Sequence, residues 1–232
     1  IIKIERKGKL IKVENIEVFN FQGALRGMRN PLESWDKSDS YWNDTTIESV
    51  KDFIIGEKDM TLALKLIKAG NEHAKFMRQI FVSMDITAPL YWWKEADTYK
   101  ISTVANSTST MHKMGSRPLI YEDFSWDKFF ETNLGNITDE YIYNSIEKYR
   151  QDTLSHLNEL IEIWQERRDK KIWLAIIQNL PSSFNQMRTW TGNYQVLRNM
   201  YFQRRNHKLK EWKDFCKVIE ELPYSELIIV EK

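Results

Sequence analysis

The chain is poor in cysteine: Cys216 is the single one among 232 residues. One thiol excludes an internal disulfide framework and a metal site built from several cysteines, and its helical surroundings predict a half-buried, unreactive side chain. Glycine and proline are also sparse, at 8 and 5 residues, and no repeat or Gly/Ser linker divides the chain. No apolar run reaches the length of a membrane span and no N-terminal signal pattern is present, so we expect a cytoplasmic protein without a membrane partner.

The chain also lacks an excess of charge of either sign. The chain has 34 basic and 33 acidic residues, a formal net charge of +1, so we expect no nucleic-acid partner. The length suits one domain over residues 1–232 with one substantial core. Aromatic residues are plentiful, at 13% with 9 tryptophans. They indicate either a packed core or oligomer interface, or platforms on which bases or a flavin ring stack.

The general motifs of enzyme chemistry are missing. The sequence has no G-x-G-x-x-G, no Walker phosphate loop, no H-E-x-x-H and no G-x-S-x-G elbow. The 4 histidines do not stand at metal-ligand spacing from one another. We therefore predict no metal site, and the residues alone assign no catalytic group.

Hydrophobic periodicity predicts strands and a helix in the first half of the chain. Residues 15–21 and 80–86 alternate in the manner of strands, and residues 59–69 follow a helical period. Asp59 is a candidate cap for this helix, and Gly70 is a plausible stop.

The second half is dominated by helical patterns. One begins near residue 138 with an acidic first turn, a second covers roughly 169–179, and a third runs from about 193 to 222 before Pro223. Strands followed by long helices predict an α+β fold.

Two segments concentrate polar residues. Residues 94–113 are rich in hydroxyl groups, and they are either a polar loop with a helix start or part of a binding site. Residues 191–207 form the opening and first turns of the third helical pattern. On an ideal helix Asn193 and Arg204 fall within about 20° of each other, whereas Asn199 lies off that stripe. The segment is either an ordinary solvated face or a helix that serves two separate sites.

These segments share an ordered set of motifs with one family. Residues 70–89 read as a helix end, a turn with His73, and a strand leading to Ala-Pro. Residues 98–111 align with the pattern R-H-R-x-x-S-x-N-E-x-S-x-R, with one inserted residue before Asn106. Further along the chain, the remaining motifs follow in the family's order: Leu180-Pro181, residues 190–193, Asn199 and Arg204. Over roughly 60–222 the chain resembles the FAD-dependent thymidylate synthases (ThyX). Residues 22–58 have no counterpart.

The resemblance implies roles for individual residues. Those that match cofactor contacts of the family are His73, Lys100, Asn106, Asn193 and Asn199. Those at substrate-binding positions are Ser107, Ser109 and Arg204.

Several charged positions of the family pattern are replaced. R-H-R becomes Thr98-Tyr99-Lys100, the glutamate becomes Ser107 and the final arginine becomes Met111. An arginine before Leu-Pro becomes Ile177, and a glutamine before R-H-R becomes Glu95. Guanidinium groups hold phosphates in two-pronged geometry, so these losses indicate a changed ligand or compensation by nearby groups such as Arg188.

The resemblance also implies a fold and three alternative functions. The fold is the ThyX-like α+β domain, with a small antiparallel sheet and long helices, assembled as a homotetramer whose sites are built by several subunits. The first function is flavin-dependent C5 methylation, or related alkylation, of a pyrimidine nucleotide such as dUMP. It would use FAD, with NADPH and methylenetetrahydrofolate as co-substrates. The alternatives are a flavin- or nucleotide-binding protein without synthase activity, and a scaffold protein.

Overall fold

The computed structural model describes residues 6–7, 10–43, 52–126 and 139–231. Its main sheet is antiparallel, and its strands stand in the order β1-β2-β5-β7-β6. They are β1 (Arg6–Lys7), β2 (Lys12–Phe19), β5 (Phe81–Pro89), β7 (Asn185–Asn193) and β6 (Val104–Ser107). A separate pair joins β3 (Tyr41–Asn43) to β4 (Asp52–Ile54). The predicted α+β class with a small antiparallel sheet is confirmed.

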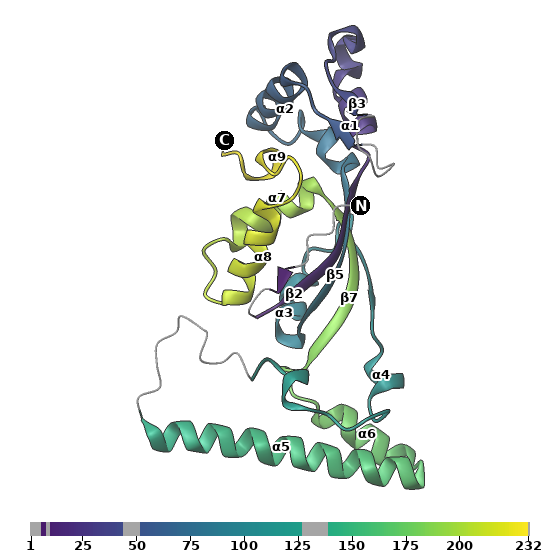
Figure 1. Cartoon of the computed structure of the whole chain (residues 1–232), viewed down its shortest axis with the longest axis vertical. Helices are drawn as coiled ribbons and strands as arrows, with labels where there is room; N and C mark the ends of the chain where they lie inside the picture. Colours follow the sequence, from purple (N-terminus) through teal and green to yellow (C-terminus); the bar gives the residue numbers. More distant parts are fainter. Residues whose placement is uncertain (1–5, 8–9, 44–51, 127–138, 232) are drawn as a thin grey trace.

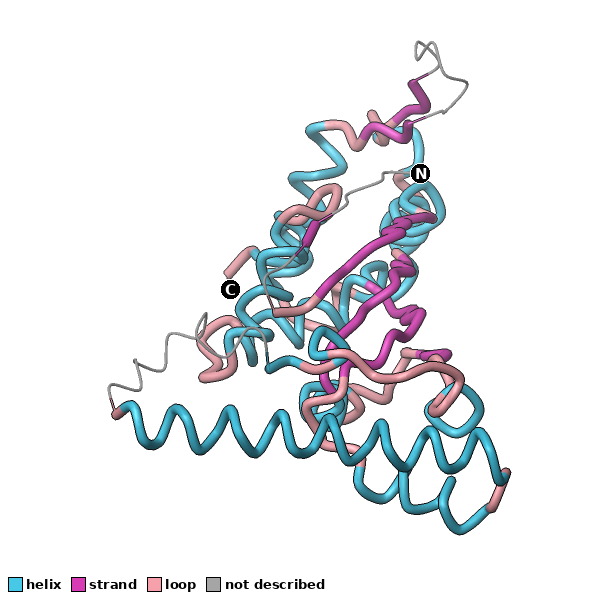
Figure 2. The backbone as a smooth tube through the Cα atoms, turned by 60° about the horizontal axis from the view of Figure 1, so that its bottom comes forward, coloured by secondary structure: helices cyan, strands magenta, loops and turns pink. Residues whose placement is uncertain are grey.

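The helices lie mostly on one side of this sheet and at its two ends (Figures 1 and 2). They are α1 (Phe21–Arg29), α2 (Glu57–Ala69), α3 (Leu90–Ala96), α4 (Thr110–Lys113), α5 (Glu140–Arg167), α6 (Lys170–Asn179), α7 (Tyr194–Arg204), α8 (Lys210–Glu220) and α9 (Glu226–Ile229). No helix within these described ranges is long and apolar enough to cross a membrane.

The central strand β5 shows why the sheet has two different faces. Val82, Met84 and Ile86 are buried against the layer of α3, α7 and α8 (Figure 1), because alternate side chains of a strand point to one side. On the opposite side Ser83 receives a hydrogen bond from Thr191 at 3.2 Å, and Asp85 receives one from Thr189 at 2.6 Å. We call this polar side, marked by those four residues, the open face.

The first predicted strand is displaced toward the N-terminus. Residues 15–21 were expected, but β2 covers Lys12–Phe19 and Phe21 already begins α1. The reason is local backbone geometry: Asn20 has φ 72°, which turns the chain out of the strand. Asn15 also has a positive φ, 50°, where the pairing register with β5 shifts between Glu14 and Glu17. Because of this bulge, the inward-facing side chains of β2 point to the core both before and after the register shift.

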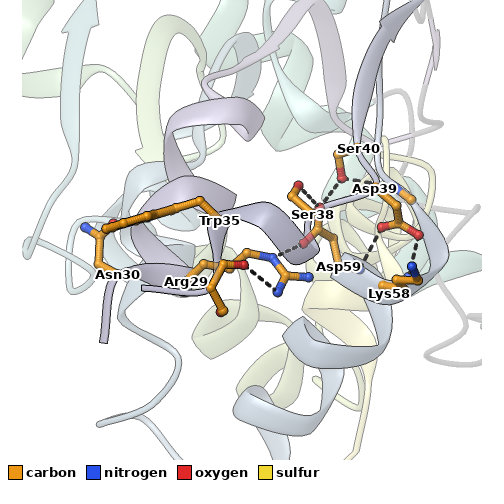
Figure 3. Close-up of polar contacts among 10 residues, drawn as sticks. Arg29, Asn30, Trp35, Ser38, Asp39, Ser40, Lys58 and Asp59 are labelled. Atoms are coloured by element: carbon orange, nitrogen blue, oxygen red, sulfur yellow. Dashed lines mark hydrogen bonds and ion pairs between the residues drawn. The ribbon is translucent and has the colours of Figure 1, made fainter. Parts of the chain in front are cut away.

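Part of the region that sequence comparison left without a role, residues 29–40, is held to α2 by a buried polar network (Figure 3). The candidate cap Asp59 is not a cap, because it lies inside α2 and is fully buried. Its carboxylate accepts hydrogen bonds from Arg29 Nε at 2.6 Å and from the hydroxyls of Ser38 and Ser40 at 2.5 Å each. The helix start is instead capped by Asp39, which accepts from the backbone N–H of Lys58 and of Asp59. Gly70 ends α2 as predicted, with φ 120°.

The long helix α5 and the shorter α6 lie together beyond one end of the sheet (Figure 2). A second hydrophobic cluster, separate from the one beneath the sheet, is formed there by α5, α6 and residues 114–126. Its buried members are Met114, Leu119, Phe124, Trp126, Leu157, Ile161 and Ile176. Asn158 on α5 holds the neighbouring segment: its Oδ1 accepts from Leu119 N at 2.7 Å and its Nδ2 donates to Leu119 O at 3.0 Å. Asp139 and Asp169 cap the two helices, which places both close to the predicted starts.

The third helical pattern is not one helix. Residues 193–222 divide into α7 and α8, because the chain turns at 205–209 while the apolar periodicity continues across the turn. Cys216 lies in α8 and is buried rather than half-buried. Burial raises the pKa of its thiol to about 12, which makes it unreactive at neutral pH.

Candidate cofactor and substrate site

The start of α7 fixes Asn193. This residue ends β7 in extended conformation (φ −140°, ψ 169°), and its Oδ1 accepts a hydrogen bond from Val196 N at 3.0 Å. Asparagine is among the best N-cap residues, which is why the helix begins there. Asn193 is only 3% exposed, and the glycine before it is required because a Cβ at Gly192 would lie 2.3 Å from the ring of Trp190. The helical projection used for Asn193 and Arg204 is therefore wrong, because Asn193 stands outside the helix.

A cavity of about 440 Å³ lies beside α7. It is lined by Asn71, Arg198, Asn199, Phe202, Gln203, Arg205 and Glu231. Asn199 is exposed toward it, and its Oδ1 accepts from Gln195 Nε2 at 3.2 Å. Asn71 belongs to the turn after α2 that also carries the exposed His73. Two residues predicted to contact a cofactor, His73 and Asn199, thus come from neighbouring parts of one surface.

Positive charge is concentrated in this cavity. The guanidinium groups of Arg198 and Arg205 lie 4.6 and 4.9 Å from the centre of the Phe202 ring. Arg205 is paired with Glu231 at 2.9 Å, whereas Arg198 forms no ion pair with any residue that the structure describes and donates to Ile228 O at 2.5 Å. Arg198 is 7% exposed, and burial lowers its pKa. A buried cation without a carboxylate, next to carboxamides, favours an anionic or carbonyl-rich ligand.

Arg204, at the end of α7, points elsewhere. Its Nη1 donates to Glu95 Oε2 at 2.7 Å, and its Nε donates to the hydroxyl of Tyr99 at 3.0 Å. Its guanidinium carbon lies 4.8 Å from the Trp212 ring centre and 5.7 Å from that of Tyr99. On α7, Asn199 therefore faces the cavity and Arg204 faces α3.

Lys100 borders a second cavity, of about 450 Å³, between α3 and the edge of the sheet. Its lining includes Trp93, Asp97, Lys100, Arg188 and Trp190. The guanidinium carbon of Arg188 lies 4.3 Å from the Trp93 ring centre, and its Nη1 contacts Asp97 Oδ1 at 2.8 Å. One cation over a tryptophan ring, with Lys100 and Trp190 also in the lining, suits a planar anion, although the carboxylate of Asp97 already neutralises Arg188.

The remaining predicted residues lie on or after the edge strand β6. Asn106 pairs with Thr189 and faces the open face, whereas Ser107 pairs with Arg188 and faces the helices. Ser109 caps α4: its hydroxyl accepts from His112 N at 3.0 Å and lies 2.8 Å from His112 Nδ1. Asn106 and Lys100 consequently lie on opposite faces of the sheet and do not meet within one chain.

Sequence reasoning missed several residues of the α7 cavity. Arg198 and Phe202 belong to no motif, Asn71 lies in the 70–89 motif but received no role, and Glu231 reaches Arg205 only because α9 folds back on α7. The one available indication was the Arg-x-x-x-Phe-x-x-Arg spacing from Arg198, which places all three side chains along one helix face. For a metal there is no candidate: the described residues contain no cluster of three or more histidine, cysteine or acidic side chains that could hold an ion.

Comparison with solved structures identifies the architecture. The chain matches no protein-family model and no curated protein sequence. It superposes on thymidylate synthase X (ThyX) from Helicobacter pylori with FAD and dUMP, with a TM-score of 0.61 at 17% identity, over 95% of this chain and 97% of that one. A second structure of the H. pylori flavin-dependent enzyme, complexed with FAD and dUMP, gives 0.62 at 18% identity, over 92% and 95%.

The fold is that of ThyX. Because both matches cover nearly the whole of each chain, the likeness includes the α5–α6 layer as well as the sheet. Identities of 17–18% establish the ThyX fold and leave the ligands and the chemistry of this chain to be argued from its own residues.

Proposed function

We propose that the chain is a flavin-dependent enzyme that methylates, or otherwise alkylates, C5 of a pyrimidine nucleotide such as dUMP. The observation that carries the proposal is the α7 cavity: it lies on a ThyX fold at the position of Asn199, a motif residue, and is lined by amide and guanidinium groups. When bound, FAD would supply hydride and one-carbon transfer, with NADPH and methylenetetrahydrofolate as co-substrates.

The residues present fit a flavin. A flavin carries several carbonyl acceptors and a pyrophosphate, and Arg198, Asn199 and Asn71 offer donors to such groups. Gln195 positions Asn199 by donating from its Nε2 to Asn199 Oδ1 at 3.2 Å, while its own Oε1 is buried without a partner among the described residues. His73 would border the same site from the turn after α2.

The other proposed contacts require more than one chain. Asn106 is on the open face, Lys100 is on the helix side, and Asn193 is used to cap α7. We propose that these groups reach a cofactor across the interfaces of a homotetramer, as do Ser107 and Ser109 for the pyrimidine nucleotide. Arg204 is the remaining proposed substrate contact.

A second candidate function is a catalytically inactive flavin- or nucleotide-binding or scaffold protein. The observation that favours it is that arginines which a phosphate would need are already paired with carboxylates. Arg204 is bound to Glu95, and Arg188 is bound to Asp97. In that case the fold would persist without turnover.

The deciding experiment is the visible absorbance spectrum of the purified protein before and after addition of FAD. We expect bound-flavin bands, or a saturable perturbation of added FAD, and weaker binding in Asn199→Ala. Asn144→Ala, an exposed asparagine on α5, is the matched control and should bind as the parent does. Turnover is then tested with dUMP, methylenetetrahydrofolate and NADPH. Flavin binding without product selects the inactive alternative, and a folded protein indifferent to FAD refutes both flavin proposals.

A further inference from the structure

Glu95 is the centre of a closed set of contacts that joins α3 to α7 and α8. Its Oε2 accepts hydrogen bonds from Arg204 Nη1 at 2.7 Å and from Trp212 Nε1 at 2.9 Å. The Nε2 atom of His207 lies 3.5 Å from the same oxygen. The carboxylate therefore stands where an anionic ligand of Arg204 would otherwise sit.

Arg204 has little capacity left for a second anion. Its side chain is 19% exposed and lies between the rings of Trp212 and Tyr99, which restrict its movement. Its Nε is used by the Tyr99 hydroxyl, which in turn donates to Gln203 Oε1 at 2.9 Å. The pair Glu95–Arg204 carries no net formal charge. A phosphate dianion approaching Arg204 would meet the like charge of Glu95 at close range.

The other oxygen of Glu95 points to the kind of ligand that suits this place. Oε2 receives both hydrogen bonds that described residues donate to the Glu95 carboxylate, and the side chain is 34% exposed, so Oε1 is left as an acceptor. A carboxylate accepts hydrogen bonds and offers none. A sugar hydroxyl or a ring N–H can donate to it, whereas a phosphate dianion only accepts.

From this geometry we propose that Glu95 is a specificity-determining residue that makes the chain select a neutral pyrimidine nucleoside over its 5′-monophosphate. The proposal rests on the proposed function in one respect: it takes Arg204 as the residue at the substrate site. It differs in the substrate class, because the nucleoside would bring a 5′-hydroxyl donor in place of the phosphate.

The test is calorimetric titration of the full chain, in the presence of saturating FAD, with deoxyuridine and with dUMP. We expect deoxyuridine to bind more tightly than dUMP. In Glu95→Gln the carboxylate charge is removed and Arg204 is released, so dUMP affinity should rise by at least about tenfold. Glu159→Gln, an exposed carboxylate on α5, makes the same change of net charge and should leave both affinities unaltered.

The outcomes separate the two proposals. If the parent chain binds dUMP at least about tenfold more tightly than deoxyuridine, the nucleoside inference is overturned while the pyrimidine function stands. If dUMP affinity is equal in Glu95→Gln and the parent, Glu95 does not set specificity. If neither pyrimidine binds although FAD does, both the inference and the pyrimidine assignment fail. The parent comparison needs no variant, so it remains decisive if Glu95→Gln does not fold.

Discussion

At the scale of single residues, the buried ion pair of Arg29 and Asp59 places the strictest requirement on hydrogen bonding. Their side chains are 5% and 0% exposed, and the two hydroxyls of Ser38 and Ser40 complete the coordination of the carboxylate (Figure 3). Burying two charges is unfavourable unless they are paired and hydrogen-bonded; here Asp59 accepts three hydrogen bonds, and Arg29 donates to Asp59 and to Ser34 O. The network also explains how residues 29–40 are fixed against α2.

Replacing Asp59 by asparagine should therefore destabilise the fold strongly. The substitution keeps the shape but leaves the Arg29 guanidinium buried without a counter-charge, a loss of about 3–5 kcal/mol. The free energy of unfolding, measured by urea titration, checks it. Asp152→Asn on the exposed side of α5 is the matched control, and equal losses in the two variants would show that the buried pair is not stabilising.

The same residue predicts how stability depends on pH. Burial alone would raise the pKa of Asp59, but hydrogen bonds from Ser38, Ser40 and Arg29 outweigh it and hold this pKa below its ordinary 3.8. A carboxyl group whose pKa is depressed on folding stabilises above its unfolded pKa and loses that contribution as the pH falls through the folded one. The stability difference between parent and Asp59→Asn should thus be constant above about pH 4 and shrink in stronger acid. Urea titrations at a series of pH values test this, and a difference that grows on acidification would contradict it.

At the scale of helices and strands, local patterns predicted β2, β5 and the helices α2, α5 and α6, and failed where tertiary contacts decide. The α2, α5 and α6 helices have strong periodicity with caps or stops. Both predicted ends of α2 and α6 and the predicted start of α5 lie within about two residues of the observed ones, the usual margin. The turn between α7 and α8 was missed because its cause is distant in sequence: Glu95 on α3 contacts Arg204, His207 and Trp212 on both sides of the turn. Asp59 was misread for the same reason, since its partners lie 19–30 residues away.

The attachment of α5 offers a test at this scale. Asn158 satisfies both backbone groups of Leu119, so Asn158→Ala leaves a largely buried N–H and C=O without partners, at about 1–3 kcal/mol. We expect faster amide hydrogen exchange in residues 114–126 and in the packed turns of α5. Asn144→Ala makes the same substitution at an exposed position of α5 and should leave exchange in 114–126 unchanged. Identical exchange in both variants would show that hydrophobic packing alone holds this layer.

At the scale of the whole molecule, the motif order along the sequence was sufficient to predict the ThyX fold, because the motifs mark successive strands and helix starts. It was insufficient to locate one site. The structure brings the His73 turn and Asn199 together, but it directs Asn106 to the open face and Lys100 to the helix side. Spacing along a chain carries no information on which face of a neighbouring copy a side chain meets. The residues of the α7 cavity outside the motifs, such as Arg198, could not be predicted for a related reason: whether they line one cavity depends on how α9 packs.

The separation of these residues within one chain leads to the last prediction. If a flavin site requires Asn106 and Lys100 as well as Asn199, one chain cannot complete it, and flavin should be bound only by the assembly. In sedimentation velocity, we expect visible flavin absorbance to travel with a species of the mass of four 27.8 kDa chains. On dilution, bound flavin and this species should disappear together, because loss of a neighbour removes part of the site. Asn106→Ala should weaken flavin binding while preserving the assembly, with Asn144→Ala again as the matched control. Flavin absorbance that sediments with a single 27.8 kDa chain would contradict a shared site and place the cofactor entirely in the α7 cavity of one subunit.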